Sequence, residues 1–176
     1  MDLNQENIQK IVAQVLSEMK GTSSQPAQAA APAQFEIPKK ARVAMLTALR
    51  KIEIKEFDIP EISDDEMLVK VEGCGICGTD VHEYKNDPFG LIPVVLGHEG
   101  SGVIVKMGKN ITMDTTGKPL TVGDRIVTCT IPCGHCDACL NMRDRDNLCE
   151  NSGIYGLMPE DDHYHFNGWF SDYLVI

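Results

Sequence analysis

Apolar and polar residues alternate along several short segments from residue 51 onward. The segment KIEIKEFDI at 51–59 alternates throughout, and similar segments lie at 66–73, 101–108, 124–131 and 172–176. Strict alternation is typical of half-buried β-strands, and Gly, Pro, Asn and Asp residues separate these segments. Many short strands at this spacing predict a mainly β fold, either an antiparallel barrel or a sandwich.

A different period runs through the N-terminus. Within residues 3–20, apolar side chains recur every three or four positions, as on one face of a helix, at Ile8, Ile11, Val12, Val15, Leu16 and Met19. The stretch GTSSQPAQAAAPAQ that follows has no charge and no large apolar residue, which predicts a flexible linker. We therefore expect an amphipathic helix at 1–20, a linker at 21–37 and a folded domain at 38–176.

One short helix is expected inside the folded domain, from about Thr79 to Asn86, where an Asp-Pro pair ends it. It follows GCGICG at 73–78, which matches the glycine pattern of dinucleotide-binding loops. That pattern acts between a buried parallel strand and a long helix. Because the preceding strand alternates and the following helix is short, we interpret the match as chance.

Composition and charge exclude several classes of partner. The chain has 176 residues, is 43% hydrophobic and carries a formal net charge of −10, which argues against a nucleic-acid surface. Its apolar runs fall short of the roughly 20 residues of a membrane span. The N-terminus also lacks the pattern of a secretory signal. We expect a cytoplasmic protein in a reducing compartment, with neither nucleic acid nor membrane as a partner.

Four of the seven cysteines lie close together, in CGHCDACLNMRDRDNLC at 133–149, which we call the cysteine lobe. Four thiolates at one point are the ligands of a structural zinc, and they are also those of an iron–sulfur cluster. Disulfides fit less well, because the count is odd and the compartment is reducing. A closed four-thiolate site has no open position, so the chemistry must lie elsewhere.

A second group of metal-ligand residues occurs in GCGICGTDVHEY at 73–84 and GHEGSG at 97–102. A catalytic zinc takes about three ligands from Cys, His and Asp/Glu and leaves one position open. Cys77 and His98 are suitable first ligands. Each has a simpler interpretation, as a small buried residue or as a satisfied polar group.

The chain from about residue 38 resembles the catalytic, GroES-like domain of the zinc-dependent medium-chain alcohol dehydrogenases. The segments GICGTDVHEY, GHEGSGVIV, VGDRIV and the cysteine lobe carry the resemblance, in the order of that family. The closing NGWFSDYLVI is similar to a Gly-aromatic-x-x-Tyr strand of the same family. The resemblance implies a partly open antiparallel β-barrel with a zinc-binding loop lobe.

It also implies roles for individual residues. Cys77 and His98 would be ligands of the catalytic zinc, and Glu99 would be a further ligand or a neighbouring carboxylate. Thr79 would take the proton of the alcohol, and His82 would relay it toward solvent. Such a zinc lowers the pKa of a bound hydroxyl and polarises an aldehyde carbonyl in the reverse reaction.

Two further assignments follow from the resemblance. Asp80 would orient His98, because ligand histidines usually need a second partner. The structural zinc would be held by Cys133, Cys136, Cys139 and Cys149. The family commonly has seven residues between the last two of these cysteines, whereas this chain has nine.

The family's third catalytic ligand and its nucleotide-binding domain are expected after residue 176. The sequence therefore predicts that this chain alone is inactive and that NAD(P) binds only to a fuller form. That form is expected to be a homo-oligomer acting on a small alcohol or aldehyde. Aromatic and histidine residues near the end are expected either to line the cleft or to pack in a surface loop: His163, Tyr164, His165, Phe166 and Trp169.

The N-terminal helix and linker resemble the encapsulation peptides of bacterial microcompartment enzymes. The resemblance implies location in the microcompartment lumen, with shell or cargo proteins as partners of residues 1–20. It also implies a small aldehyde such as acetaldehyde or propionaldehyde as substrate, reduced to regenerate NAD. Two alternatives remain: a zinc-stabilised module without turnover, or a related polyol, threonine or formaldehyde dehydrogenase.

Overall fold

A computed structural model of the chain describes residues 35–142, 145–159 and 165–176. The helix and linker predicted before residue 35 lie outside this part. In chain order the elements are β1 (Lys40–Ala48), β2 (Lys51–Asp58), β3 (Met67–Cys74), α2 (Gly78–Asn86), β4 (Val94–Val95), β5 (Gly100–Met107), β6 (Arg125–Val127), α3 (Asp137–Asn141), a 3-10 helix (Asp146–Leu148) and β7 (Tyr173–Val175).

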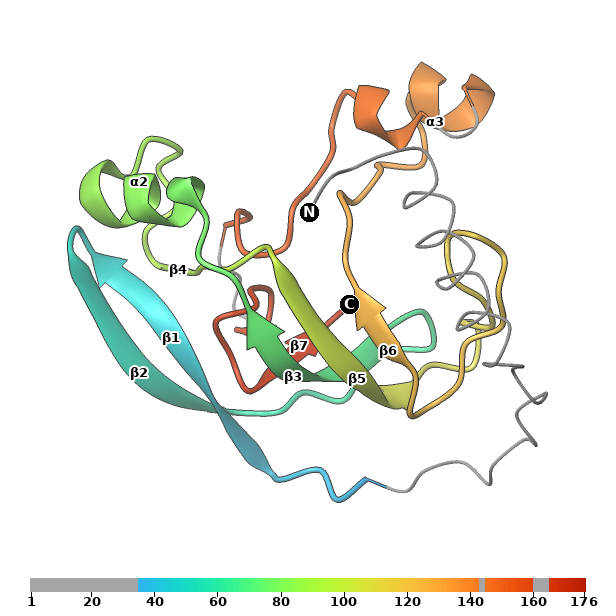
Figure 1. Cartoon of the computed structure of the whole chain (residues 1–176), viewed down its shortest axis with the longest axis horizontal. Coiled ribbons are helices and arrows are strands. Elements are labelled where there is room, and N and C mark those ends of the chain that lie inside the picture. The colour runs from blue at the N-terminus through green and yellow to red at the C-terminus, as the bar shows by residue number, and fades with distance from the viewer. Residues whose placement is uncertain (1–34, 143–144, 160–164) are drawn as a thin grey trace, which may run out of the picture. The chain divides into compact units, whose positions relative to one another are not determined.

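The strands form two sheets in which every described pair is antiparallel. A three-stranded sheet has the order β2-β1-β4, and a four-stranded sheet has the order β6-β5-β3-β7. In Figure 1, β1 and β2 form a long hairpin. Helix α2 and the segment containing α3 lie outside the sheets, at two different places. The prediction of a mainly β, open antiparallel fold is confirmed.

Three strands differ from the sequence prediction, and one of them is the unpredicted two-residue strand β4. The strand expected at 124–131 is only β6, which ends at Val127. The chain leaves the sheet there, and the next residue, Thr128, accepts a hydrogen bond from the indole N–H of Trp169 at 2.9 Å. Strand β1 was not predicted, because Met45 and Leu46 are consecutive apolar residues that are both buried, one in each of two apolar clusters.

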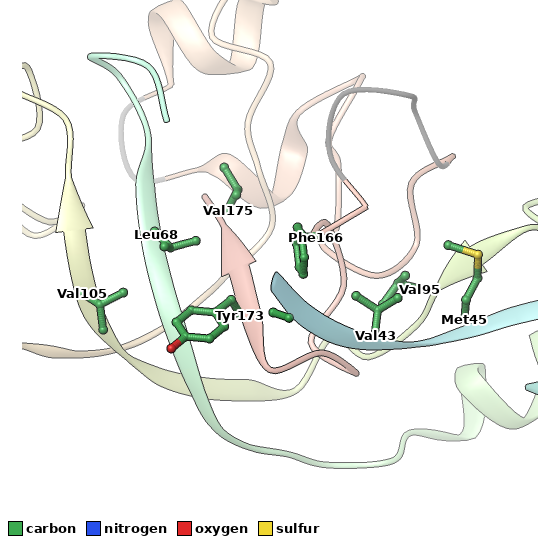
Figure 2. Close-up of a cluster of buried hydrophobic side chains, with 9 residues drawn as sticks. Val43, Met45, Leu68, Val95, Val105, Phe166, Tyr173 and Val175 are labelled. Carbon is green, nitrogen blue, oxygen red and sulfur yellow. The ribbon is translucent and has the colours of Figure 1, made fainter. Parts of the chain in front are cut away.

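The main core lies where the two sheets approach each other. Side chains from β1, β3, β4, β5 and β7 gather with Phe166 in one cluster, as Figure 2 shows. Its buried members are Ala41, Val43, Met45, Leu68, Val95, Val105, Phe166, Tyr173 and Val175. This core holds β3 and β5 in fixed register, and the candidate ligands lie in the segments just after β3 and just before β5.

The glycine pattern at 73–78 lies in the wrong structural context for a dinucleotide. It begins at the end of β3, which pairs antiparallel with both of its neighbours, and it leads into α2, a helix of nine residues. The predicted context, an antiparallel strand followed by a short helix, is confirmed. Among the described helices, none is long and apolar enough to cross a membrane.

Candidate metal centres

The N-terminus of α2 is built around one buried carboxylate. Cys77 is the N-cap, and its backbone N–H donates to Asp80 Oδ2 at 2.8 Å. The other oxygen, Asp80 Oδ1, accepts the N–H of Gly97 at 3.2 Å and lies 3.5 Å from His98 Nδ1. Asp80 is only 3% exposed. One side chain thus connects the helix that carries Cys77 to the loop that carries His98.

Cys77, His98 and Glu99 converge, and we call these three residues the Cys77 cluster. One ligand atom from each lies within 4.8 Å of the others. The two segments are joined by the N–H of Gly75, which donates to the carbonyl of Glu99 at 3.0 Å. A Cβ on Gly75 would lie 2.7 Å from Glu99 Oε2, so the glycine makes room for this carboxylate.

Glycines on the His98 segment allow a similarly close approach of aromatic rings. A Cβ on Gly97 would lie 2.6 Å from the Phe170 ring, and Gly97 has a positive φ of 94°. A Cβ on Gly100 would lie 2.0 Å from the Trp169 ring. The segment before β7 thus packs through Phe170 and Trp169 against the loop that carries His98 and Glu99. Sequence reasoning missed these glycines, although the clustering of Gly around both ligand segments is a signal of close backbone approach.

Thr79 and His82 are placed differently relative to this cluster. The Thr79 hydroxyl lies 3.7 Å from the Cys77 sulfur. His82 is exposed on the next turn of α2. Thr79 therefore adjoins the ligands, whereas His82 faces solvent, and the relay between them stays a prediction.

The four sulfurs of the cysteine lobe form a second, tighter group. The Sγ separations are 3.5 Å for Cys136–Cys139, 3.9 Å for Cys133–Cys139 and 4.0 Å for Cys136–Cys149. A tetrahedron of thiolates around zinc at about 2.3 Å has sulfur separations of about 3.8 Å. All seven cysteines are free thiols. The spacing therefore fits four ligands of one zinc ion and does not fit disulfides.

Backbone donors in the lobe favour negative charge on sulfur. The N–H of Glu150 is the main cause that lowers the pKa of the Cys136 thiol to about 6. The N–H of Cys133, 3.2 Å from Cys149 Sγ, lowers the pKa of Cys149. Burial instead raises the pKa of Cys139 to about 12. Donors aimed at sulfur are what a thiolate metal site requires.

Two aromatic residues near the C-terminus, Phe166 and Trp169, lie in the interior. Phe166 and Trp169 are each 1% exposed and belong to two apolar clusters, so of the two alternatives their burial favours packing over lining a cleft. Burial against both sheets gives them a packing role instead. His165 stacks on Phe57, with ring centroids 3.8 Å apart. His163 and Tyr164 lie outside the described residues.

Comparison with known proteins places these features in one family. The alcohol dehydrogenase GroES-like domain matches residues 63–176. S-(hydroxymethyl)glutathione dehydrogenase of Photobacterium damsela subsp. piscicida is 38% identical over 142 residues, covering 71% of this chain and 36% of that protein. Sorbitol dehydrogenase of Bacillus subtilis (strain 168) is 35% identical over 130 residues, covering 71% and 35%.

Solved structures give the same result. Alcohol dehydrogenase from Thermotoga maritima has 34% sequence identity and a TM-score of 0.69, covering 78% of this chain and 38% of its own. A protein described as a zinc-binding dehydrogenase from Sinorhizobium meliloti 1021, bound to NADP, has 32% identity and a TM-score of 0.60, covering 79% and 36%. The chain spans about a third of the length of these relatives. It belongs to the zinc-dependent medium-chain alcohol dehydrogenases and carries their GroES-like domain.

Proposed function

We propose that this chain supplies the metal-binding and proton-handling part of a zinc-dependent dehydrogenase that interconverts a small alcohol and its carbonyl compound. The convergence of Cys77, His98 and Glu99 is the observation that carries the proposal. Its ligand types are those of catalytic zinc sites. The names of the relatives differ in substrate, since they include a hydroxymethyl thiol adduct and a polyol, so they support only the class of reaction.

The residues of the Cys77 cluster fit a zinc ion in type and in spacing. Zinc, when bound, would lower the pKa of a hydroxyl placed on it and polarise a carbonyl. Asp80, held by two backbone N–H groups, would fix the ring of His98 through Nδ1 and leave Nε2 for the metal. Glu99 would complete the protein ligands or lie beside them. The cysteine lobe would hold a second zinc with no open position.

The proton path would begin at Thr79. Its hydroxyl is beside Cys77 Sγ, so it would accept the proton of an alcohol placed at the cluster. His82, exposed one turn later on α2, would pass that proton to water. Imidazole is the side chain that most often serves as a proton shuttle in proteins.

The described residues do not fit a nicotinamide dinucleotide. Their strand pairs are antiparallel, and the described part contains no parallel strand–helix–strand unit. NAD(P) would therefore bind through a further part of a complete enzyme, as NADP is bound in the Sinorhizobium structure. We accordingly expect no turnover from this chain alone.

Cobalt substitution tests the proposal directly. The loaded chain should bind about two metal ions, and adding a small primary alcohol should shift the visible spectrum of one of them. Cys77→Ser should remove that responsive ion and leave the other. Cys129→Ser, which changes an exposed cysteine outside both groups, is the matched control. A spectrum that no alcohol or aldehyde alters would refute a substrate-binding role for the Cys77 cluster.

Turnover needs a second experiment. The chain can be joined to the part of the Sinorhizobium relative that it does not span. NADPH-dependent reduction of a small aldehyde by the fusion, and its loss in the Cys77→Ser fusion, would support the proposed reaction. Turnover that is unchanged by Cys77→Ser would contradict it.

We also propose that residues 1–20 direct the protein into a bacterial microcompartment. The support is the sequence alone, namely the apolar stripe and the uncharged linker after it. A fluorescent protein carrying residues 1–34 should enter microcompartments when shell genes are co-expressed. Changing Ile11 and Leu16 to Glu should leave the fusion diffuse, because it removes the apolar stripe. A fusion that stays diffuse without these changes would contradict targeting and the small-aldehyde substrate that it implies.

A further inference from the structure

Helix α2 carries a fully buried carboxyl group that the proposed chemistry does not use. Glu83 is 0% exposed, and neither of its side-chain oxygens makes a hydrogen bond of normal geometry among the described residues. A buried charge without a partner is strongly unfavourable, so such a group normally becomes neutral. Glu83 therefore needs a physical explanation.

The surroundings of Glu83 contain a second acid rather than a base. Asp87 follows the helix as its C-cap, in a left-handed conformation with φ 47°, and its N–H donates to the carbonyl of Glu83 at 3.0 Å. The Asp87 carboxylate accepts the N–H of Leu91 at 2.7 Å. Two acidic residues four positions apart thus lie at the end of α2, and one of them helps to hold the turn that follows.

Other charged groups near this end of the helix do not neutralise Glu83. Arg50 on the β1–β2 turn and Lys85 on α2 are exposed. Asp80, one turn earlier, is engaged by Cys77 and Gly97. Burial raises the pKa of the Glu83 carboxyl, and the Asp87 carboxylate raises it further, while the N–H of Phe89 opposes both.

We propose that Glu83 is protonated in the folded protein and donates its proton to the Asp87 carboxylate, and that this acid pair positions α2. The proton stays on Glu83 and is shared with an oxygen of Asp87, so the pair carries one negative charge. The pair joins the end of α2 to the turn at 87–91. Glu83 is thus a positioning residue for Cys77 and Thr79, which lie at the other end of the same helix. This positioning role rests on the proposed function, whereas the protonation of Glu83 does not.

The direction of the pH effect follows from the buried position. A carboxyl with a higher pKa in the folded than in the unfolded chain contributes stability fully below its ordinary value of 4.5. That contribution is lost as the pH rises through the folded-state pKa. Glu83→Gln keeps the size, the donor for Asp87 and an acceptor for Phe89, but it cannot ionise.

Urea unfolding of the full chain at pH 5 and pH 8 tests the protonation. Trp169 is the only tryptophan and is buried, so its fluorescence reports unfolding. The urea midpoint of the wild type should decrease from pH 5 to pH 8 by more than the midpoint of Glu83→Gln does. At pH 5 the two proteins should have the same midpoint. Glu56→Gln, at an exposed carboxyl on β2, should follow the wild type. Equal pH dependence in wild type and Glu83→Gln would overturn the proposal.

A second pair of measurements remains decisive if Glu83→Gln fails to fold. Asp87→Asn removes the like charge, so the pH dependence should weaken. The infrared band of a protonated buried carboxyl should be present at pH 7 in the wild type. Its absence would overturn the proposal.

Positioning is tested with cobalt alone. Glu83→Ala should weaken cobalt binding at the Cys77 cluster several-fold and leave the cysteine lobe unchanged, and Glu83→Gln should restore it. Equal affinity in Glu83→Ala and wild type would refute the positioning role. If wild type binds no cobalt at the Cys77 cluster, the proposed function fails, while the urea comparison still decides the protonation.

Discussion

The cysteine lobe and the Cys77 cluster gather metal-ligand side chains in opposite ways. The lobe takes all four sulfurs from 17 consecutive residues, and its described residues between them include a five-residue helix, α3, and a short 3-10 helix. The Cys77 cluster takes its ligands from a helix N-cap and from the loop before β5, and it depends on Asp80 and on aromatic rings from the segment before β7. The geometry of the cysteine lobe depends mainly on residues that are close in the sequence. The geometry of the Cys77 cluster depends on packing between segments that are distant in the sequence.

The largest effect is expected in the lobe. Cys136→Ser should reduce bound zinc by one ion per chain and make residues 133–149 sensitive to protease, because most of the described residues of this segment are exposed. Structural zinc in zinc-finger peptides contributes about 10–16 kcal/mol of binding free energy. Metal analysis and limited proteolysis measure the change. If the cysteine lobe instead stays folded and metal-loaded, it does not depend on its sulfurs.

Gly100→Ala should reveal how far the Cys77 cluster depends on packing. The added Cβ would overlap the Trp169 ring inside the core, which should cost about 3 kcal/mol of unfolding free energy. Metal binding at the Cys77 cluster should weaken, while the lobe keeps its ion. Denaturant unfolding and metal titration are the measurements, and Gly73→Ala, at an open and exposed position on β3 without a positive φ, is the glycine control for packing. Equal losses at both sites would mean that the two regions are not independent.

Asp80→Asn should have an intermediate effect that is confined to the Cys77 cluster. The amide keeps the shape but cannot provide two negatively charged acceptors for Cys77, Gly97 and His98. Loss of such an orienting carboxylate typically lowers metal affinity about 10–100-fold. Competition with a chelator measures this, with Asp58→Asn on exposed β2 as the control. An unchanged affinity would exclude Asp80 as the residue that orients His98.

The smallest effect is expected from His135→Ala in the lobe. His135 Nδ1 lies 2.8 Å from the carbonyl of Cys133, and the residue is exposed. An exposed contact of this kind contributes about 0.5 kcal/mol. Zinc affinity of the lobe should therefore change less than about threefold in a chelator titration. A loss as large as that of Asp80→Asn would remove the contrast between the two regions.

The two regions also differ in how far they can be predicted. The cysteine lobe is visible in the sequence because its ligands are close neighbours in the chain. Cys77 and His98 are 21 positions apart; their residue types made them candidate ligands, and the resemblance assigned them to one catalytic zinc. Nothing in the local pattern indicated that Phe166 and Trp169 pack in the core, because an aromatic residue in a loop has the same local sequence whether it faces a cleft or the interior.

Residue order alone determined the alternating strands β2, β3, β5 and β7, the short helix α2 and the density of sulfur in the lobe. These features depend on side-chain period, on helix-ending residues and on neighbours in the chain. Only the tertiary structure decided that β6 ends at Val127 and that Glu83 is buried. It also decided that Gly75 leaves space for the Glu99 carboxylate and Gly100 for the Trp169 ring. Each of these outcomes depends on which distant atoms occupy the same space, and close packing of distant segments leaves no periodic signal in the chain.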